Sequence, residues 1–168
     1  MAYPGTAALG SALYSRFPLR DLGLRVHSSG FAQARAAVTV PGAPAVAVES
    51  VHPCAPGGPE ADHCWSRDLA DQQPATVDSG IQLLLGDFNA TLDHAPLRRL
   101  ISTGYRDAGQ SRGAGLTPTW PYDGKPIPGV TLDHVLADRR VGVAEYAVYP
   151  VPGTDHRAVY AELVLPTT

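Results

Sequence analysis

The pattern of apolar and polar residues along the chain predicts a series of short strands. Ile81–Leu85 is a short apolar run stopped by Gly86-Asp87, which is typical of a buried strand. Ala43–Val51 is mostly apolar and β-branched and ends at His52-Pro53, which predicts a strand leading into a loop. Three further strands are predicted at Val130–Leu136, Ala144–Val151 and Ala158–Leu165.

Helical patterns are fewer and shorter. Ala95–Ser102 is a helix candidate, with Asp93 as its predicted N-cap and Gly104 as its stop. Cys64–Ala70 is a candidate for a second, shorter helix. The stretch Ser111–Gly129 is rich in Gly and Pro and predicts a long loop.

Composition supports a loop-rich globular domain rather than a helical bundle. The 168 residues suit one domain with one core, and the chain contains 17 Gly and 16 Pro. We find no internal repeat, so a single domain over residues 1–168 is expected. The net charge of −3 lacks the basic footprint of non-specific nucleic-acid binders and leaves small phosphoesters and lipid headgroups as candidate ligands.

Localisation is left open by the sequence. Met1–Gly10 shows no basic segment followed by an apolar one, and no apolar run approaches 18 residues, so neither a signal peptide nor a transmembrane helix is visible. A longer, membrane-anchored form of the protein is compatible with this. Cys54 and Cys64 are the only cysteines and permit one disulfide in an exported protein.

The histidines are distributed unusually, because four of the six directly follow an aspartate. Composition alone gives about 0.4 such pairs. The four are Asp62-His63, Asp93-His94, Asp133-His134 and Asp155-His156. Neighbouring side chains on a strand point to opposite faces, so Asp133 and His134 cannot share one pocket, and we expect Asp133 to face the site.

Hydrolysis of a phosphoester needs residue types that this chain contains. His156 is a natural base for activating water, and Asp133 or Asp155 could fix its tautomer. Asp87 offers carboxylate oxygen atoms to a hard cation such as Mg²⁺. The Asn89 amide can donate to a phosphoryl oxygen.

The chain contains the segments LLLGDFNA at Leu83–Ala90, TLDHVL at Thr131–Leu136 and GTDHRAV at Gly153–Val159. Together these three segments resemble the signature motifs of the endonuclease/exonuclease/phosphatase superfamily. Leu83–Ala90, LLLGDFNA, is similar to its GDFN motif. Thr131–Leu136, TLDHVL, resembles the next motif, an Asp at a strand end, and Gly153–Val159, GTDHRAV, resembles its C-terminal Ser-Asp-His-Arg-Pro-Val signature. Upstream, Ala12–Leu19 resembles the strand and turn before the central part of the domain, and Val48–Pro53 resembles a strand ending in an active-site His in the pancreatic deoxyribonuclease branch.

The resemblance implies a role for each matching residue. His156 would be the general base or a contact to the attacked phosphate, and Asp133 its orienting carboxylate. Asp87 would position the nucleophile or leaving group and contribute to metal binding. Asn89 would contact the phosphate. The remaining two are His52, a second catalytic and phosphate-binding His, and Asp155, a metal ligand.

The resemblance also implies a fold, a cofactor and a substrate class. The expected fold is α+β, a four-layer α/β/β/α sandwich with two mixed sheets. The expected function is a Mg²⁺- or Mn²⁺-dependent phosphoesterase acting, as a monomer without a protein partner, on nucleic acid, inositol phosphate or a phospholipid headgroup. The family's Asn and main metal-binding Glu lie upstream of the segment that Ala12–Leu19 resembles, and the 12 residues before Leu13 contain neither. We therefore expect a domain truncated at its N-terminus, and a catalytically inactive remnant that binds phosphate ligands is the alternative.

Other hypotheses fit less well. Asp87 with Asn89, and Asp155 with His156, could be simple turns. The residues His52, Cys54, His63 and Cys64 invite a structural zinc site, but their spacing is not a usual zinc pattern. A Ser-His-Asp hydrolase would need a G-x-S-x-G segment, which the sequence lacks.

Overall fold

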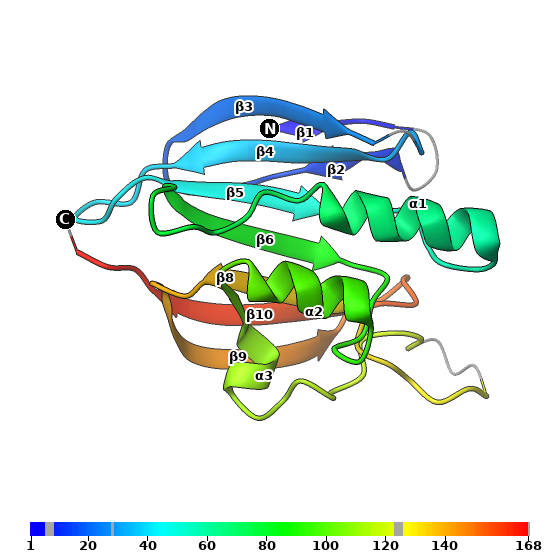
Figure 1. Ribbon diagram of the computed structural model, residues 1–168. Coiled ribbons are helices and arrows are strands. Elements are labelled where there is room, and N and C mark those ends of the chain that lie inside the picture. The colour runs from blue at the N-terminus through cyan, green and yellow to red at the C-terminus, as the bar shows by residue number, and fades with distance from the viewer. Residues whose placement is uncertain (6–8, 28, 123–125, 168) are drawn as a thin grey trace.

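The computed structural model describes residues 1–5, 9–27, 29–122 and 126–167, and the part of the predicted loop at 123–125 lies outside them. Within these ranges, five strands come first, helices and strands then alternate through the middle of the chain, and a run of three strands comes last (Figure 1). The strands are β1 Ala2–Tyr3, β2 Ser11–Ala12, β3 Leu19–Val26, β4 Ala32–Val38, β5 Val46–Val51, β6 Ile81–Asp87, β7 Tyr105–Asp107, β8 Asp133–Asp138, β9 Gly142–Pro150 and β10 Arg157–Val164. The helices are α1 Pro59–Ala70, α2 Ala95–Ser102 and α3 Ala108–Ser111.

A six-stranded sheet with the order β3-β4-β5-β6-β8-β7 forms the centre of the molecule. β5 and β6 are parallel, whereas the other neighbours are antiparallel, so the sheet is mixed. The expected α+β class is thereby confirmed. Strands β9 and β10 form a separate two-stranded antiparallel sheet, and β1 pairs with β2.

The two faces of the six-stranded sheet carry different cores. Trp65 and Leu69 of α1 and Leu97 of α2 pack in one cluster with Leu84 of β6 and other sheet residues. This is the helix-covered face, seen in front in Figure 1. A second cluster lies on the other face, which we call the inner face, and combines sheet residues with Leu163 and Leu165 from the β10 region. Of the described helices, none is long and apolar enough to cross a bilayer.

The predicted elements that rest on apolar runs are present. The predicted strands Ile81–Leu85 and Ala43–Val51 correspond to β6 and β5, and the predicted helix over Ala95–Ser102 coincides with α2. The three later strand predictions correspond to β8, β9 and β10. Helix α1 begins at Pro59, five residues earlier than the predicted helix Cys64–Ala70, because proline is tolerated in a first turn.

One helix cap was predicted wrongly. Asp93 was expected at the N-cap of α2, but His94 occupies that position with an extended backbone and no side-chain capping bond. The His94 ring instead accepts the backbone N–H of Thr91 at 2.9 Å. The helix therefore begins one residue later than its aspartate suggests.

Strand β5 leaves no room for a side chain at Gly86 of the neighbouring strand β6. A Cβ added at this glycine would lie 2.2 Å from the carbonyl oxygen of Val51, and its φ of +142° is a conformation that side chains rarely adopt. Only glycine fits this position. The two residues involved, Val51 and Gly86, directly precede His52 and Asp87.

Candidate active site

Three neighbouring strand ends place His52, Asp87 and Asp133 side by side. Val51 of β5 pairs with Gly86 of β6, so His52 and Asp87 are the next residues of two parallel strands. Asp87 in turn pairs with Asp133, the first residue of β8. The sheet register alone therefore gathers three of the predicted site residues at one edge.

Strand alternation decides which face these side chains use. Asp87 is two and four residues from Leu85 and Leu83, which pack in the inner-face cluster. Asp133 has the same parity as Ala137, another member of that cluster. Because alternate residues share a face, both carboxylates point away from the helices. They lie on the side from which the β10 region approaches.

His156, directly before β10, completes the group from that side. Its Nδ1 lies 2.9 Å from Asp133 Oδ2, a hydrogen-bonding distance. Its Nε2 lies 3.9 Å from Asp87 Oδ2, and His52 Nε2 is also 3.9 Å from that same oxygen. The Asp87 carboxylate thus sits between two imidazole rings whose side chains are each 29% exposed and therefore accessible to a ligand.

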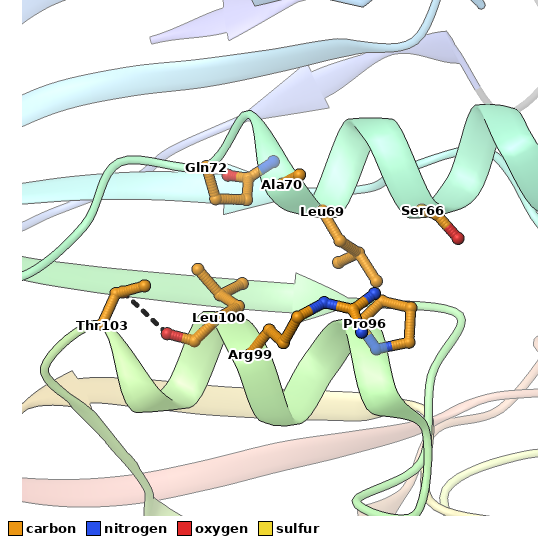
Figure 2. A pocket seen from close by; sticks show the side chains of 8 residues that line it. All are labelled: Ser66, Leu69, Ala70, Gln72, Pro96, Arg99, Leu100 and Thr103. Atoms are coloured by element: carbon orange, nitrogen blue, oxygen red, sulfur yellow. Dashed lines mark hydrogen bonds between the residues drawn. The ribbon is translucent and has the colours of Figure 1, made fainter.

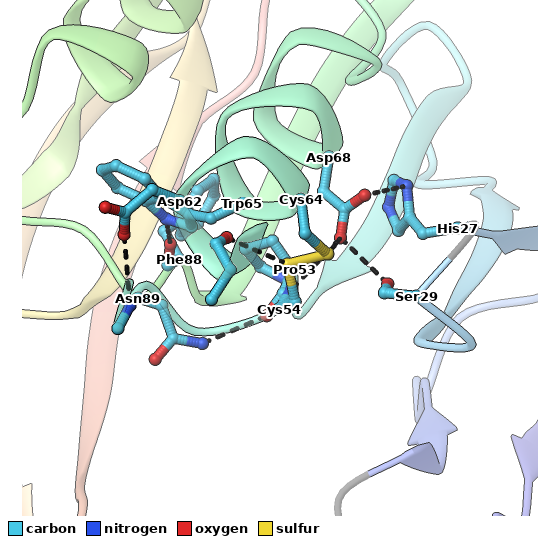
Figure 3. The surroundings of a disulfide bond; sticks show 12 residues. His27, Ser29, Pro53, Cys54, Asp62, Cys64, Trp65, Asp68, Phe88 and Asn89 are labelled. Carbon is cyan, nitrogen blue, oxygen red and sulfur yellow. Dashed lines mark hydrogen bonds and ion pairs between the residues drawn. A yellow bond between two sulfur atoms is a disulfide. The ribbon is translucent and has the colours of Figure 1, made fainter. Parts of the chain in front are cut away.

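Asn89 is held beside this group by its unusual backbone. Its φ of +49° lies in the left-handed region, which asparagine tolerates better than most residues. This turn lets its backbone N–H donate to Asp87 Oδ1 at 2.7 Å, while its side-chain Nδ2 donates to the carbonyl oxygen of Pro53 at 3.1 Å (Figure 3). The amide orientation is therefore set by a main-chain atom next to His52.

The environment of Asp87 favours its neutral form more than water does. Burial raises the pKa of this carboxyl, and the negative charge of Asp133 raises it further. The backbone N–H of Asn89 and the rings of His156 and His52 act in the opposite direction, but the net pKa stays raised. Such a carboxylate gains from a nearby positive charge.

Asp155 is attached to the site through Trp120. Its Oδ2 accepts the indole N–H of Trp120 at 3.0 Å, and the centroid of that ring is 6.3 Å from the centroid of His156. The backbone N–H of Tyr122 donates to the backbone carbonyl oxygen of Asp155, and the backbone N–H of Arg157 donates to the backbone carbonyl oxygen of Thr119. The segment 119–122, which the sequence predicted as part of a loop, is therefore held against the chain on both sides of His156.

The donor set has the chemistry that a hard divalent cation requires. Asp87, Asp133 and Asp155 offer carboxylate oxygen atoms, the ligands that Mg²⁺ and Mn²⁺ prefer. The raised pKa of Asp87 results from burial and from a neighbouring negative charge, and both effects are relieved when a cation binds. The donor types therefore suit the predicted Mg²⁺ or Mn²⁺, but among the described residues these three carboxylates are not a group whose ligand atoms all lie within 4.8 Å of one another, so the metal site stays a prediction.

The zinc alternative does not fit the structure. Cys54, Cys64 and Asp68 bring their ligand atoms within 4.8 Å of one another, but the two sulfurs are joined in a disulfide and are not free thiolates. His52 faces Asp87, and His63 is exposed on α1. The cysteines thus form the single bridge that the sequence permitted.

Two histidines have buried positions on the helix-covered side. His134 is 1% exposed, with Nδ1 2.9 Å from Asp107 Oδ2 and Nε2 2.8 Å from the carbonyl oxygen of Ala90. This agrees with its expected position away from the pocket. The sequence suggested only a surface or capping role for His27, but this residue is buried and its Nδ1 lies 3.3 Å from Asp68 Oδ1. Neither ring belongs to the site.

A cavity of about 420 Å³ opens beside His156. Its other lining residues are Ala55, Pro56, Asn89, Thr91, His94, Trp120, Val130 and Leu132. A smaller cavity of about 200 Å³ lies between α1 and α2 (Figure 2), and it contains no predicted site residue. Its lining residues are Ser66, Leu69, Ala70, Gln72, Pro96, Arg99, Leu100 and Thr103. Of these two, the first is next to His156 and Asn89, whereas Asp155 lines a separate cavity of about 600 Å³.

Two residues that position the site were not identified from the sequence. Thr119 is buried, and its Oγ1 accepts the backbone N–H groups of Leu132 and Asp133, which fixes the start of β8. Pro53 contributes only its carbonyl oxygen. Thr119 precedes Trp120 between two motifs, which was the available signal, whereas a main-chain acceptor leaves no signal in the residue types.

Comparisons with known proteins give one family and many structures. The model of the "Endonuclease/Exonuclease/phosphatase family" matches residues 2–156. No curated protein matches the chain. An endonuclease/exonuclease/phosphatase from Beutenbergia cavernae has a TM-score of 0.66 and 22% identity over 90% of this chain. The match covers 46% of that protein, so the chain spans about half its length.

Two further structures share the fold. The 3′ phosphatase NExo from Neisseria, bound to a product DNA hairpin, has a TM-score of 0.64 and 22% identity over 88% of this chain and 72% of its own. The human Nocturnin catalytic domain, with a bound sulfate anion, has a TM-score of 0.60 and 18% identity over 90% of this chain and 60% of its own. From the family match over residues 2–156, the chain belongs to the endonuclease/exonuclease/phosphatase family.

Proposed function

We propose that the protein is a divalent-metal-dependent phosphoesterase in which His156 activates water. The observation that carries the proposal is the position of the Asp87 carboxylate between two imidazoles, with His156 hydrogen-bonded to Asp133 at 2.9 Å. A base, its orienting carboxylate and a second carboxylate are the groups that hydrolysis by activated water needs.

The hydrogen bond to Asp133 gives His156 a defined role. When Nδ1 donates to the carboxylate, Nε2 carries the lone pair and faces Asp87. Nε2 can then accept the proton of a water molecule as that water attacks phosphorus, while the ester P–O bond breaks and the leaving oxygen takes up a proton from solvent. Asp133 steadies the resulting imidazolium.

The other predicted residues would bind the substrate and the metal. Asn89 and His52 donate hydrogen bonds to phosphoryl oxygens, with the Asn89 amide held by Pro53. Asp155 and Asp87 would hold Mg²⁺ or Mn²⁺. The cation, when bound, neutralises negative charge on the phosphoryl group.

We propose residues 1–168 as one domain that works as a monomer on a phosphoester substrate. The Neisseria structure holds a DNA product, which favours nucleic acid as a first candidate. Inositol phosphates and phospholipid headgroups are the other two, because the family fold does not determine the substrate.

The test is a substrate panel with matched histidine variants. DNA with a 3′ phosphate, DNA duplexes, inositol phosphates and phospholipids are incubated with Mg²⁺, with Mn²⁺ and with EDTA. We expect metal-dependent turnover that His156→Ala lowers by about 10³-fold or more and that His63→Ala, an exposed control, leaves unchanged. Equal rates in wild type and His156→Ala would refute the assignment.

A phosphate-binding protein without catalytic activity is the second candidate. It is favoured by the positions of the four glutamates, none of which is at the site. Glu49 pairs with Arg25 and Arg35 on the sheet, and Glu60 lies exposed in the first turn of α1. Glu145 pairs with Glu162 in the β9–β10 sheet. Binding of inorganic phosphate without hydrolysis of any panel substrate would favour this candidate.

A further inference from the structure

The segment 52–54 connects the end of β5 to two groups of the candidate site. His52 brings its Nε2 to 3.9 Å from Asp87, and the Pro53 carbonyl accepts from the Asn89 amide at 3.1 Å. A shift of this short segment would therefore move one imidazole and release one amide. The segment has no regular secondary structure of its own, so other contacts must fix it.

Two links join the segment to α1, and both act on Cys54. Its sulfur is bonded to Cys64, and its backbone N–H donates to Asp68 Oδ2 at 3.1 Å (Figure 3). Cys64 and Asp68 are four residues apart and lie on one face of the helix. The end of the segment is thus attached both by its side chain and by its main chain.

Asp68 is an unusual residue for this position. It is 1% exposed, and a buried carboxylate is costly unless its oxygens have partners. Oδ2 also accepts from Ser29 Oγ at 3.1 Å, whereas Oδ1 accepts no hydrogen bond and has His27 Nδ1 as a neighbour at 3.3 Å. An apolar residue would fill the space beneath α1 more cheaply, but it would leave the N–H of Cys54 without an acceptor.

We propose that Asp68 and the Cys54–Cys64 disulfide are a positioning device for the active site, acting through Pro53 on the Asn89 amide. The inference rests on the proposed function for its kinetic consequence. Its structural consequence, a fixed Asn89 amide, is independent of any activity. Asp68 contacts no site residue itself and works through the segment that it holds.

Asn89 provides a direct readout, because it is the single asparagine in the chain. Protein labelled with ¹⁵N only in asparagine side chains gives one NH₂ signal pair, which reports the bond to Pro53. Four proteins are compared: wild type, Asp68→Ala, the double variant Cys54→Ser/Cys64→Ser, and the combination of all three changes. We expect the two proton shifts of the pair to converge and their solvent exchange to accelerate, most of all in the combined variant.

The conservative variant Asp68→Asn separates positioning from packing. Its amide oxygen can still accept from Cys54 and Ser29, while its NH₂ group can face His27, so we expect wild-type signals. Val141→Ala, on the inner face and away from the segment, is the control for lost stability. It should lower the unfolding free energy without changing the Asn89 signals.

Kinetics on the best panel substrate provide the second readout. We expect kcat to fall about 10-fold or more in the combined variant, with a smaller change in KM, and to be retained in Asp68→Asn and Val141→Ala. Unchanged Asn89 signals in the combined variant would overturn the proposal, and if that variant does not fold, Asp68→Ala decides by the same criterion. Altered signals in a protein whose wild type hydrolyses nothing would support the positioning device and refute the enzyme.

Discussion

Asp133 and His134 are consecutive residues whose side chains serve opposite faces of β8. Asp133 bonds to His156 on the inner face. His134 bonds to Asp107 beneath the helices. One Asp-His pair therefore contributes its acid to the candidate site and its base to the core, and the two residues can be tested separately.

Replacing Asp133 by Asn should remove most of the proposed activity while preserving the fold. The amide cannot fix the His156 tautomer or stabilise its charged form, so we expect kcat to fall about 10³- to 10⁴-fold. Steady-state kinetics and a urea titration measure the two effects. Asp93→Asn, an exposed aspartate that also precedes a histidine, is the matched control and should leave kcat unaltered.

Replacing His134 by Phe should reduce stability rather than change the chemistry directly. The substitution leaves the Asp107 carboxylate, 2% exposed, without its imidazole partner. We expect the free energy of unfolding to fall by about 3 kcal/mol. His63→Phe, at an exposed position of α1, should cost far less, and equal urea midpoints for the two variants would contradict the prediction.

The left-handed backbone at Asn89 predicts an order of stability between two variants. Both Asn89→Gly and Asn89→Ala lose the amide, but only glycine adopts a φ of +49° without strain. We expect Asn89→Ala to be less stable than Asn89→Gly by about 1 kcal/mol in urea unfolding. Equal stability would mean that the turn has a different backbone conformation.

Arg140 and Asp138 predict an acid-dependent stability. Burial raises the pKa of Asp138, but hydrogen bonds from Arg140 at 2.9 and 2.6 Å outweigh it and hold the pKa below its ordinary value. A lowered pKa contributes stability above the unfolded value of about 3.9, and that contribution is lost as the pH falls through the folded value.

Arg140→Leu should therefore be less stable than wild type by about 2 kcal/mol at pH 7, since the arginine is partly exposed. The difference should shrink as the pH falls below about 4, where the carboxyl of the unfolded chain takes up a proton, and should be lost as the pH falls through the lowered folded pKa of Asp138. Thermal unfolding from pH 7 to pH 3 measures it. A gap that stays constant across this range would show that the lost arginine acts through packing alone.

The sequence predicted those strands and helices whose apolar and polar residues agree with the burial of each position in the fold. Ile81–Leu85 is apolar throughout because β6 is covered on both faces, and such a run is visible without any alignment. Strands β3 and β4 were not predicted. Strand β4 reads AQARAAV, and its alanines favour a helix in isolation. Pairing with β3 and β5 overrides that preference.

The residues of the candidate site could be predicted from the sequence, but the contacts that hold them in place could not. His52, Asp87 and Asp133 follow or begin recognisable strands, so their convergence could be expected from the sheet. The contacts of Pro53 and the burial of Asp68 could not, since they depend on main-chain atoms and on the exact packing of α1. Local sequence carries no record of such distances.

The absence of a side chain at Gly86 determines how far apart two functional groups stand. The carbonyl oxygen of Val51 lies where a methyl group on Gly86 would need to be, since an added Cβ would be 2.2 Å from it. An alanine at this position would clash with the Val51 carbonyl and increase the distance between the strand ends that carry His52 and Asp87. The distance between the His52 imidazole and the Asp87 carboxylate therefore depends on the hydrogen atom that Gly86 carries in place of a side chain. Gly86 directly precedes Asp87, just as Val51 directly precedes His52.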